Sequence, residues 1–215
     1  MNSTQKQPDT SLSLLSRVRA EDQQAWSQMV HLYGPLIGHW CRKYQLTTED
    51  TADILQVVFL SVARNITGFQ PGQRTAGHTD SDDSTTKGSR QIVTGGSFRA
   101  WLWVITRSRI LDLLKKKRCD HPKGGSSMMW QLQQLVDPIE DDPADESELQ
   151  KLVHRALEQI RTHFREATWQ AFWETTMENR DTNEVAQQLG MRPASVRQAR
   201  SRVMRQLRKQ LGDCL

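Results

Sequence analysis

The sequence has few cysteines, and their spacing narrows the classes of protein to which the chain can belong. Its three cysteines, Cys41, Cys119 and Cys214, lie at no framework spacing, and an odd number fits free thiols in a reducing compartment. Cys119 and His121 could offer a thiolate and an imidazole to a metal ion, but no second cluster supplies the remaining ligands. We therefore expect neither a disulfide framework nor a metal or other cofactor.

Long apolar runs and strand patterns are also missing. The N-terminus, MNSTQKQPDT, contains no apolar segment of a signal peptide, and no run approaches the roughly 18 apolar residues that a membrane span needs. We therefore expect a cytoplasmic protein without a membrane span. No segment alternates between polar and apolar residues over a sustained stretch, and no internal repeat is present. The sequence predicts an all-α fold.

Helix signals are frequent in the first half of the chain. Leu12–Leu46 is expected to form two helices, with a break at Gly34–Pro35 and the proline in the first turn of the second helix. The hydroxyls and acids of Thr47–Asp50 predict the start of a third helix, which runs to about Ile66. Ser97 is suited to cap a fourth helix, FRAWLWVITRSRILDLLKKK, whose apolar residues lie on more than one face.

Two polar stretches divide the chain. Residues 71–97 contain hardly any apolar residues, so we expect a mobile inserted loop there. Residues 119–147 combine Pro, Gly and Ser with most of an acidic block, Asp137–Glu148, that has seven acids and no base. We therefore predict two small helical domains, 10–118 and 148–212, joined by a flexible acidic linker.

The C-terminal region predicts four helices, of which the last two form a helix-turn-helix. The first two carry apolar stripes at helical spacing: Val153, Leu157, Ile160 and Phe164, then Trp169, Phe172, Trp173 and Met177. Asp181–Glu184 is a variant of the capping box, and Gly190 supplies the left-handed residue that ends the short third helix. Pro193 suits the first turn of the longer fourth helix, the one that enters the major groove in such a motif.

This last helix lies in the segment RPASVRQARSRVMRQLRK, which contains six arginines, one lysine and no acid. A projection at 100° per residue gathers the apolar residues around Val196 on one side and most cations on the other. Arg200 falls near the edge of the apolar stripe, where we expect its stem to follow the core. The candidate DNA contacts are Arg192, Ser195, Arg197, Gln198, Ser201, Arg202 and Arg205.

A basic amphipathic helix could instead face water, a membrane surface or an acidic partner. The capped helix and the glycine turn that precede it favour DNA, as does the small size of Val196 and Ala199, which allows another helix to approach closely.

Three stretches together resemble the extracytoplasmic-function sigma factors, the compact sigma subunits of bacterial RNA polymerase. ADILQVVFLSVARNI resembles the helix of that family that binds core polymerase, and FRAWLWVITRSRILDLLKKK resembles the helix that opens and reads the minus-ten element. NEVAQQLGMRPASVRQARSRVMRQLRK is similar to the reader of the minus-thirty-five element. With residues 12–46 these stretches cover most of the chain outside the loop and the linker, and their order and spacing agree with the family.

The resemblance implies a sigma factor that directs promoter recognition, DNA melting and transcription initiation but is not itself an enzyme. Its first domain would dock on a coiled coil of the largest polymerase subunit, and its second would bind the upstream promoter element. An anti-sigma factor is a further partner that the resemblance allows. The face that binds core polymerase would include Asp53, Gln56, Val57 and Leu60, although the family usually has an acid where this chain has Val57.

The resemblance also implies contacts with the minus-ten DNA. Bases would stack on Trp103, at roughly 1–3 kcal/mol per base, whereas Trp101 is expected in the core. The phosphates would be held by Arg107, Arg109, Lys115, Lys116 and Lys117. The loop 71–97 is longer than is usual in the family, so it would either alter the grip on the flipped base or extend into solvent. The acidic linker would either occupy the RNA channel of the polymerase or act as a spacer.

Two other functions compete with this interpretation. A helix-turn-helix transcriptional regulator that binds DNA alone would use its N-terminal half for dimerisation or ligand binding, but it leaves the basic helix with two tryptophans unexplained. A metal-dependent or nucleolytic enzyme would use the acids of Asp137–Glu148, but these lie in a Pro-rich linker without the rigid geometry that catalysis needs. The sequence does not identify the promoter, the regulon or the inducing signal.

Overall fold

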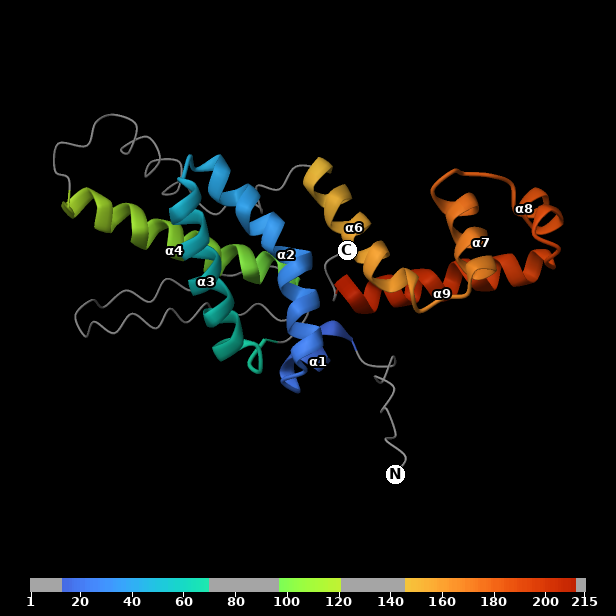
Figure 1. Cartoon of the computed structure of the whole chain (residues 1–215), viewed down its shortest axis with the longest axis horizontal. Coiled ribbons are helices and arrows are strands. Elements are labelled where there is room, and N and C mark those ends of the chain that lie inside the picture. The colour runs from blue at the N-terminus through green and yellow to red at the C-terminus, as the bar shows by residue number, and fades with distance from the viewer. Residues whose placement is uncertain (1–12, 70–96, 121–145, 212–215) are drawn as a thin grey trace, which may run out of the picture. The chain divides into compact units, whose positions relative to one another are not determined.

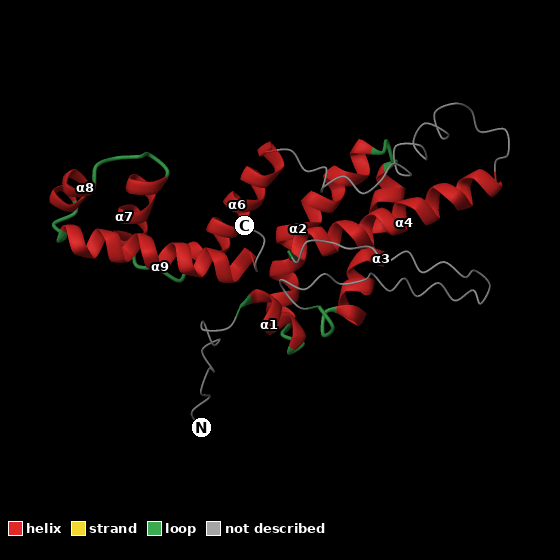
Figure 2. Cartoon of the chain, turned by 180° about the vertical axis from the view of Figure 1, so that it is seen from behind, coloured by secondary structure: helices red, strands yellow, loops and turns green. Residues whose placement is uncertain are grey.

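The computed structural model describes residues 13–69, 97–120 and 146–211, and every regular element in these ranges is a helix (Figures 1 and 2). The elements are α1 (Leu14–Arg19), α2 (Gln23–Lys43), α3 (Thr48–Asn65), α4 (Phe98–Asp120), α6 (Glu146–Arg161), α7 (Glu166–Thr176), α8 (Thr182–Gln188) and α9 (Pro193–Leu211). The predicted all-α fold is confirmed. None of these described helices has both the length and the hydrophobicity required to cross a membrane.

The helices divide into two compact units. One unit is Met29–Leu152 and contains most of α2 together with α3 and α4. The other combines Met1–Gln28 with Val153–Asp213 and contains α1, α7, α8 and α9. The boundaries fall inside α2 and α6. Helix α1 belongs with the C-terminal helices because it packs against α9.

The two polar stretches expected from the sequence fall almost wholly outside the described residues. Of the expected loop, 71–97, the structure describes only Ser97, whose hydroxyl accepts a hydrogen bond from the Ala100 N–H at 3.2 Å and so caps α4 as predicted. Of the expected linker, 119–147, the described residues are the last two of α4 and the first two of α6. The domain boundaries at 118 and 148 stay a prediction.

The break between α1 and α2 lies well before Gly34–Pro35, where the sequence predicted it. Asp22 accepts hydrogen bonds from the backbone N–H groups of Gln24 and Ala25 at 2.9 and 3.3 Å, which caps α2 at its first turn. Pro35 lies inside α2. The predicted break is wrong because a proline costs a helix interior only about 3 kcal/mol, whereas α2 buries several large side chains on both sides of it: Tyr33, Leu36, Ile37 and Trp40.

Helix α3 begins where the sequence predicts, because Thr47 and Asp50 form a capping box. The Thr47 Oγ1 accepts the Asp50 N–H at 3.2 Å, and the Asp50 Oδ2 accepts the Thr47 N–H at 3.3 Å and the Thr47 hydroxyl at 2.7 Å. Lys117 of α4 donates to the same Oδ2 at 2.6 Å. One carboxylate therefore caps α3 and also ties it to α4, the helix against which it packs.

Aromatic rings of α2 and α4 fill the core of the unit Met29–Leu152. The rings of Trp40 and Trp103 lie 5.2 Å apart between centroids, and Tyr44 stacks on Trp103 at 6.1 Å with an interplanar angle of 13°. Tyr33 meets Phe98 edge to face at 5.1 Å. Such pairs stabilise a core beyond their buried area, by about 0.5–1.5 kcal/mol each. They fix the N-terminal half of α4 against α2.

Small side chains bring the last three helices of the other unit close together. Helix α7 packs against both α8 and α9, and α8 packs against α9. One buried cluster joins Ala171 of α7, Val185 and Ala186 of α8, and Val196 and Ala199 of α9. Because none of these residues is larger than valine, the three helix backbones can approach one another closely.

The ends of α8 and the start of α9 lie where the sequence predicts. The Asp181 carboxylate accepts the backbone N–H groups of Asn183 and Glu184 at 2.7 and 3.3 Å, which satisfies two unpaired donors at the start of α8. Gly190 has a φ of 62°, a conformation that glycine adopts without strain. Pro193 is the first residue of α9.

Two apolar residues expected in buried helical stripes lie outside their helices. Helix α6 ends at Arg161, so Phe164 follows it in the connection to α7, and Met177 is the C-cap of α7 and 41% exposed. The apolar spacing in the sequence extends beyond the ends of both helices. It could not predict those ends, because the spacing of apolar residues does not mark where the backbone leaves the helix. Four residues of the stripes are confirmed as buried, Leu157, Ile160, Trp169 and Phe172, whereas Val153 and Trp173 are half-buried.

Replacing Thr47 by alanine (Thr47→Ala) removes the oxygen that caps α3 and a hydroxyl donor to Asp50. We expect the free energy of unfolding to fall by about 1–2 kcal/mol, measured by urea denaturation followed by circular dichroism. The matched control is Thr48→Ala, because Thr48 is exposed and its hydroxyl makes no hydrogen bond with another described residue. Equal losses in the two variants would contradict the assignment of the cap.

Candidate nucleic-acid interface

Helix α9 is divided into an apolar side and a polar, basic side. Val196, Ala199, Val203 and Leu207 are each no more than 3% exposed. The sequence-predicted contacts lie away from this buried side, exposed except for the half-buried Ser195: Arg192 in the preceding turn, then Ser195, Arg197, Gln198, Ser201, Arg202 and Arg205. The predicted sorting of the helix into two faces is confirmed, and contact with DNA stays a prediction.

The arginines of this region are free to meet a polyanion. Six of them are exposed, and none of their guanidinium groups forms an ion pair or hydrogen bond with another residue in the described part of the chain: Arg192, Arg197, Arg200, Arg202, Arg205 and Arg208. Arg200, whose stem was expected to lie along the core, is exposed like the others. We call these six residues the arginine face. Because no ion pair in the described part of the chain neutralises these arginines, the positive potential of the arginine face extends into solvent over roughly one Debye length, about 10 Å at 0.1 M salt.

A chain of amide hydrogen bonds holds the far end of α9. Gln210 is 4% exposed, and its Nε2 donates to the Gln159 Oε1 at 2.6 Å. Gln159 in turn donates to the backbone carbonyl of Gln28 at 3.0 Å. These contacts could not be predicted from the sequence, because glutamine is mostly exposed in proteins and its partners here lie far away along the chain. They anchor α9 at the end opposite to α8.

The basic residues of α4 do not form one free surface. Arg109 donates to the Ser61 Oγ at 3.1 Å and lies 3.7 Å from the Asp112 carboxylate, while Lys117 is bound to Asp50. These two cations therefore connect α4 to α3 or to its own next turn. The other predicted phosphate contacts differ in their surroundings: Lys115 and Lys116 are exposed and have no partner among the described residues, and Arg107 is half-buried.

The charge of Arg107 affects the pKa of Tyr44, a tyrosine of the aromatic core. Burial raises the pKa of Tyr44, and the positive charge of Arg107 partly offsets this rise. Arg107 therefore lies close to the edge of the aromatic core, one turn from Trp103 along α4.

Trp103 does not offer the exposed face that the sequence predicted. It is 5% exposed and lies against Trp40 and Tyr44. Trp103 lies one turn before Arg107 on α4, and its ring is covered by Trp40 of α2 and by Tyr44, which directly follows α2. Trp101, expected in the core, is confirmed there at 8% exposure. A base could stack on Trp103 only after the neighbouring rings moved.

Helix α3 presents the residues predicted to bind core polymerase along one exposed side. Asp53, Gln56, Val57 and Leu60 have the spacing i, i+3, i+4 and i+7, and all four are exposed. Val57 and Leu60 are 40% and 50% exposed, and they are adjacent on the helix surface. A pair of apolar side chains flanked by polar ones is typical of a protein-binding surface.

No protein-family model and no curated protein sequence matches this chain.

The last residue of the acidic block, Glu148, stabilises the fold. Glu148 lies in the first turn of α6, is 6% exposed, and pairs with Lys151 at 2.8 Å and with His39 Nδ1 at 3.5 Å. In the sequence it was the last of the seven acids of the block and the first residue of the predicted C-terminal domain. Acids in the first turn of a helix interact favourably with its dipole, a signal that the sequence contained. In the described ranges no three His, Cys, Asp or Glu side chains are grouped as metal ligands would be.

Substituting Lys117 by methionine (Lys117→Met) tests whether this lysine stabilises the fold. Burial raises the pKa of the Asp50 carboxyl, but hydrogen bonds from Lys117 and Thr47 lower it by more, so it lies below its ordinary value of 3.8. The stabilisation is therefore present above about pH 4 and is lost as the pH falls through the folded-state pKa. We expect Lys117→Met to lower the free energy of unfolding by about 1 kcal/mol at neutral pH, and the difference from the wild type to shrink as the pH falls below about 4.

The matched control is Lys116→Met, which removes an exposed neighbouring lysine without a described partner. Urea denaturation at several pH values measures both variants. A loss for Lys117→Met that stays constant down to about pH 2 would show that the Asp50 carboxylate is not its energetic partner.

Proposed function

We propose that this protein is a sigma subunit of RNA polymerase of the extracytoplasmic-function type, which binds core polymerase and directs it to promoter DNA. The observation that carries the proposal is the arginine face of α9, which is exposed, unpaired among the described residues and backed by a short capped helix. The resemblance of three stretches of sequence, in the order and spacing of that family, gives the specific role.

The geometry of α8 and α9 supports major-groove binding. Two helices joined by the turn Leu189–Arg192 and packed through small residues form a helix-turn-helix in our interpretation. In such a unit the N-terminal half of the second helix meets base edges, and this half carries Arg197, Gln198 and Arg202. Arginine donates two parallel hydrogen bonds to guanine, and glutamine pairs similarly with adenine. The outer arginines would hold phosphates.

The surface of α3 supports binding to a protein partner. Val57 and Leu60 are exposed apolar residues next to Asp53 and Gln56. Valine at position 57 replaces the acid that the family usually has there, so an apolar contact takes the place of one ion pair in the proposed complex with the coiled coil of the largest subunit.

The proposed contacts of α4 with the minus-ten element differ in kind. Lys115 and Lys116 are the simplest phosphate contacts, because they are exposed and without described partners. Arg109 and Lys117 would reach DNA only by leaving Ser61 and Asp50. Stacking on Trp103 requires its core neighbours to move. In this proposal the opening of the promoter therefore involves a rearrangement around the aromatic core of α4.

The deciding experiment is transcription with purified core polymerase on a pool of genomic promoter fragments. We expect run-off transcripts from a defined subset of fragments only when both the protein and core polymerase are present. A pull-down with core polymerase accompanies it. Failure to bind core, together with tight binding to duplex DNA alone, would overturn the sigma proposal in favour of a regulator that acts by itself.

Alanine at Arg202 or Arg197 (Arg202→Ala, Arg197→Ala) should weaken binding to the upstream element. We expect a loss of about 1–3 kcal/mol in binding free energy and relaxed specificity at one base pair if the arginine contacts a base. Fluorescence anisotropy on promoter duplexes measures both effects. The control is Arg165→Ala, an exposed arginine of the same unit that lies outside α9; unchanged promoter choice in both α9 variants would contradict the assigned face.

Glutamate at Leu60 (Leu60→Glu) should weaken binding to core polymerase without unfolding the protein, because Leu60 is 50% exposed. We expect at least a tenfold loss, the effect of about 1.4 kcal/mol at a central apolar contact, measured by titration of labelled protein with core polymerase. Val30→Glu introduces the same charge at another exposed apolar residue, 44% exposed on α2. Core binding that falls equally in both variants would argue against a specific role of α3.

A further inference from the structure

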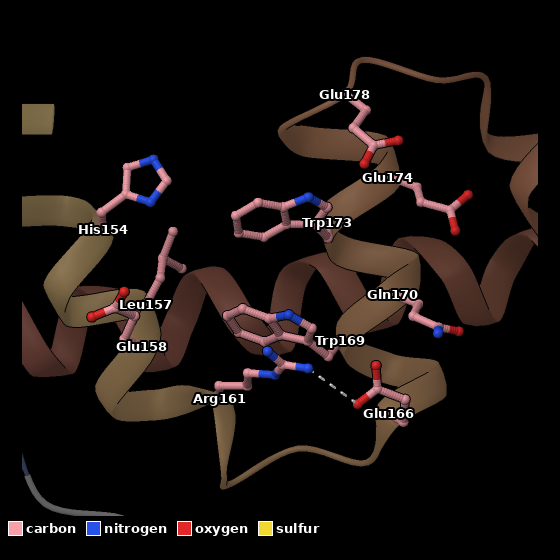
Figure 3. Close-up of a pocket in the computed structure, with 10 residues that line it drawn as sticks. All are labelled: His154, Leu157, Glu158, Arg161, Glu166, Trp169, Gln170, Trp173, Glu174 and Glu178. Atoms are coloured by element: carbon pink, nitrogen blue, oxygen red, sulfur yellow. Dashed lines mark ion pairs between the residues drawn. The ribbon is translucent and has the colours of Figure 1, made fainter. Parts of the chain in front are cut away.

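A pocket of about 450 Å³ lies between α6 and α7, and its lining includes no residue of α9 (Figure 3). All of its lining residues belong to the unit that contains the C-terminal helices. Among these lining residues four are glutamates, whereas one, Arg161, is an arginine and none is a lysine. The pocket is therefore acidic, and it lies in the same unit as the arginine face of α9.

Two tryptophans form the aromatic wall of the pocket. The rings of Trp169 and Trp173 stack with centroids 6.0 Å apart and an interplanar angle of 30°. Trp169 is 7% exposed, whereas Trp173 is half-buried and lines the pocket. A guanidinium group is attracted to the face of an indole ring, and because both groups are planar they can also stack. An aromatic wall in an acidic pocket therefore suits the side chain of an arginine.

The unpaired carboxylates of the lining lie apart from each other. Two of the four glutamates, Glu166 and Glu174, form ion pairs with arginines of the same chain. The other two, Glu158 and Glu178, are exposed and have no ion-pair partner in the described part of the chain. Figure 3 shows the Glu158 carboxylate directed away from the tryptophans, and Glu178 on the far side of Trp173. A small ligand could not meet both carboxylates, whereas a surface with several separate cations could.

The arginine face of α9 is a surface of this kind. Its guanidinium groups have no partner in the described part of the chain, and neither have Glu158 and Glu178, so one copy of the protein leaves both sets of charges unpaired. Arg197 and Arg208 are separated by roughly 16 Å along the helix axis, so one helix can bring cations to acids that lie far apart. The net charge of the whole chain is only +4, so the repulsion between two copies is weak.

We propose that the arginine face of one copy docks on the pocket between α6 and α7 of a second copy, with one guanidinium group stacked on Trp173 and others paired with Glu158 and Glu178. The two surfaces in this contact differ, so the interface is heterologous. Docking covers the arginines that are proposed to hold DNA, so a copy docked through these arginines cannot bind DNA with them. The docking itself does not depend on the sigma-factor proposal, because the charges are present whatever the arginine face binds.

Analytical ultracentrifugation of the full-length protein, freed of nucleic acid, measures the self-association. We expect the weight-average mass to rise above that of the monomer as the protein concentration increases in low salt. In about 1 M salt, where the Debye length falls to about 3 Å, we expect the mass to return to that of the monomer. A protein that stays monomeric in low salt, or an association that salt does not weaken, would overturn the proposal.

Two variants that each lack one surface locate the contact. The acid variant carries Glu158→Gln and Glu178→Gln, and in the arginine variant all six residues of the arginine face are replaced by glutamine, which has a similar helix propensity. We expect each variant alone to be monomeric, as long as circular dichroism shows that it keeps its helices. An equimolar mixture should form a one-to-one complex, because the arginines of the acid variant can still meet the acids of the arginine variant. A mixture that stays monomeric would overturn the proposal.

The matched control for the acid variant carries Glu21→Gln and Glu184→Gln. Both are exposed acids of the same unit and lie outside the pocket. This control has the same net charge as the acid variant, so we expect it to associate like the wild type. An equal loss of association in the control and in the acid variant would show a general effect of charge and overturn the assigned site.

Discussion

The burial of the apolar side of α9 against its neighbours determines where the charges of the C-terminal unit can lie. Val196, Ala199, Val203 and Leu207 are removed from water, at about 2 kcal/mol for a buried valine or leucine. A rotation of α9 about its axis would expose these side chains and bury arginines that have no acidic partners. Because unpaired buried charges cost far more than exposed ones, only one rotational setting is stable. The exposed arginine face follows from this constraint, and any role of α9 in DNA binding depends on it.

On α4, by contrast, some of the cations that could bind a ligand also stabilise the fold. The carboxylate of Asp50 caps α3 and binds Lys117, while Arg109 is engaged with Ser61 and Asp112. A cation that already has a protein partner contributes less to phosphate binding, because the first contact must be broken before the second forms. Lys115 and Lys116 carry no such cost. The basic end of α4 should therefore bind phosphates more weakly than its number of cations suggests. The arginine face of α9 retains its full charge.

Local signals in the sequence predicted most of the fold, and contacts between distant residues account for what was missed. The caps at Thr47 and Asp181 and the turn at Gly190 depend on a few consecutive residues, so a single sequence contains them. The cover over Trp103 comes from Trp40 on α2 and from Tyr44 just after it, and the helix through Pro35 is stable because its flanking residues are buried. The pocket lined by Trp169 and Trp173 was also missed, since their helical spacing is the same whether a ring lies in a core or borders a cavity.

The exposed cations of the C-terminal unit are concentrated on α9, and two exposed carboxylates without an ion-pair partner among the described residues, Glu158 and Glu178, lie on α6 and just after α7. A polyanion that approaches this unit is attracted to α9 and repelled from the pocket, so the field orients the unit before contact is made. The arginine face alone would attract DNA in many orientations. The two acids reduce the number of favourable orientations, because a duplex lying across the pocket would bring its phosphates near two carboxylates.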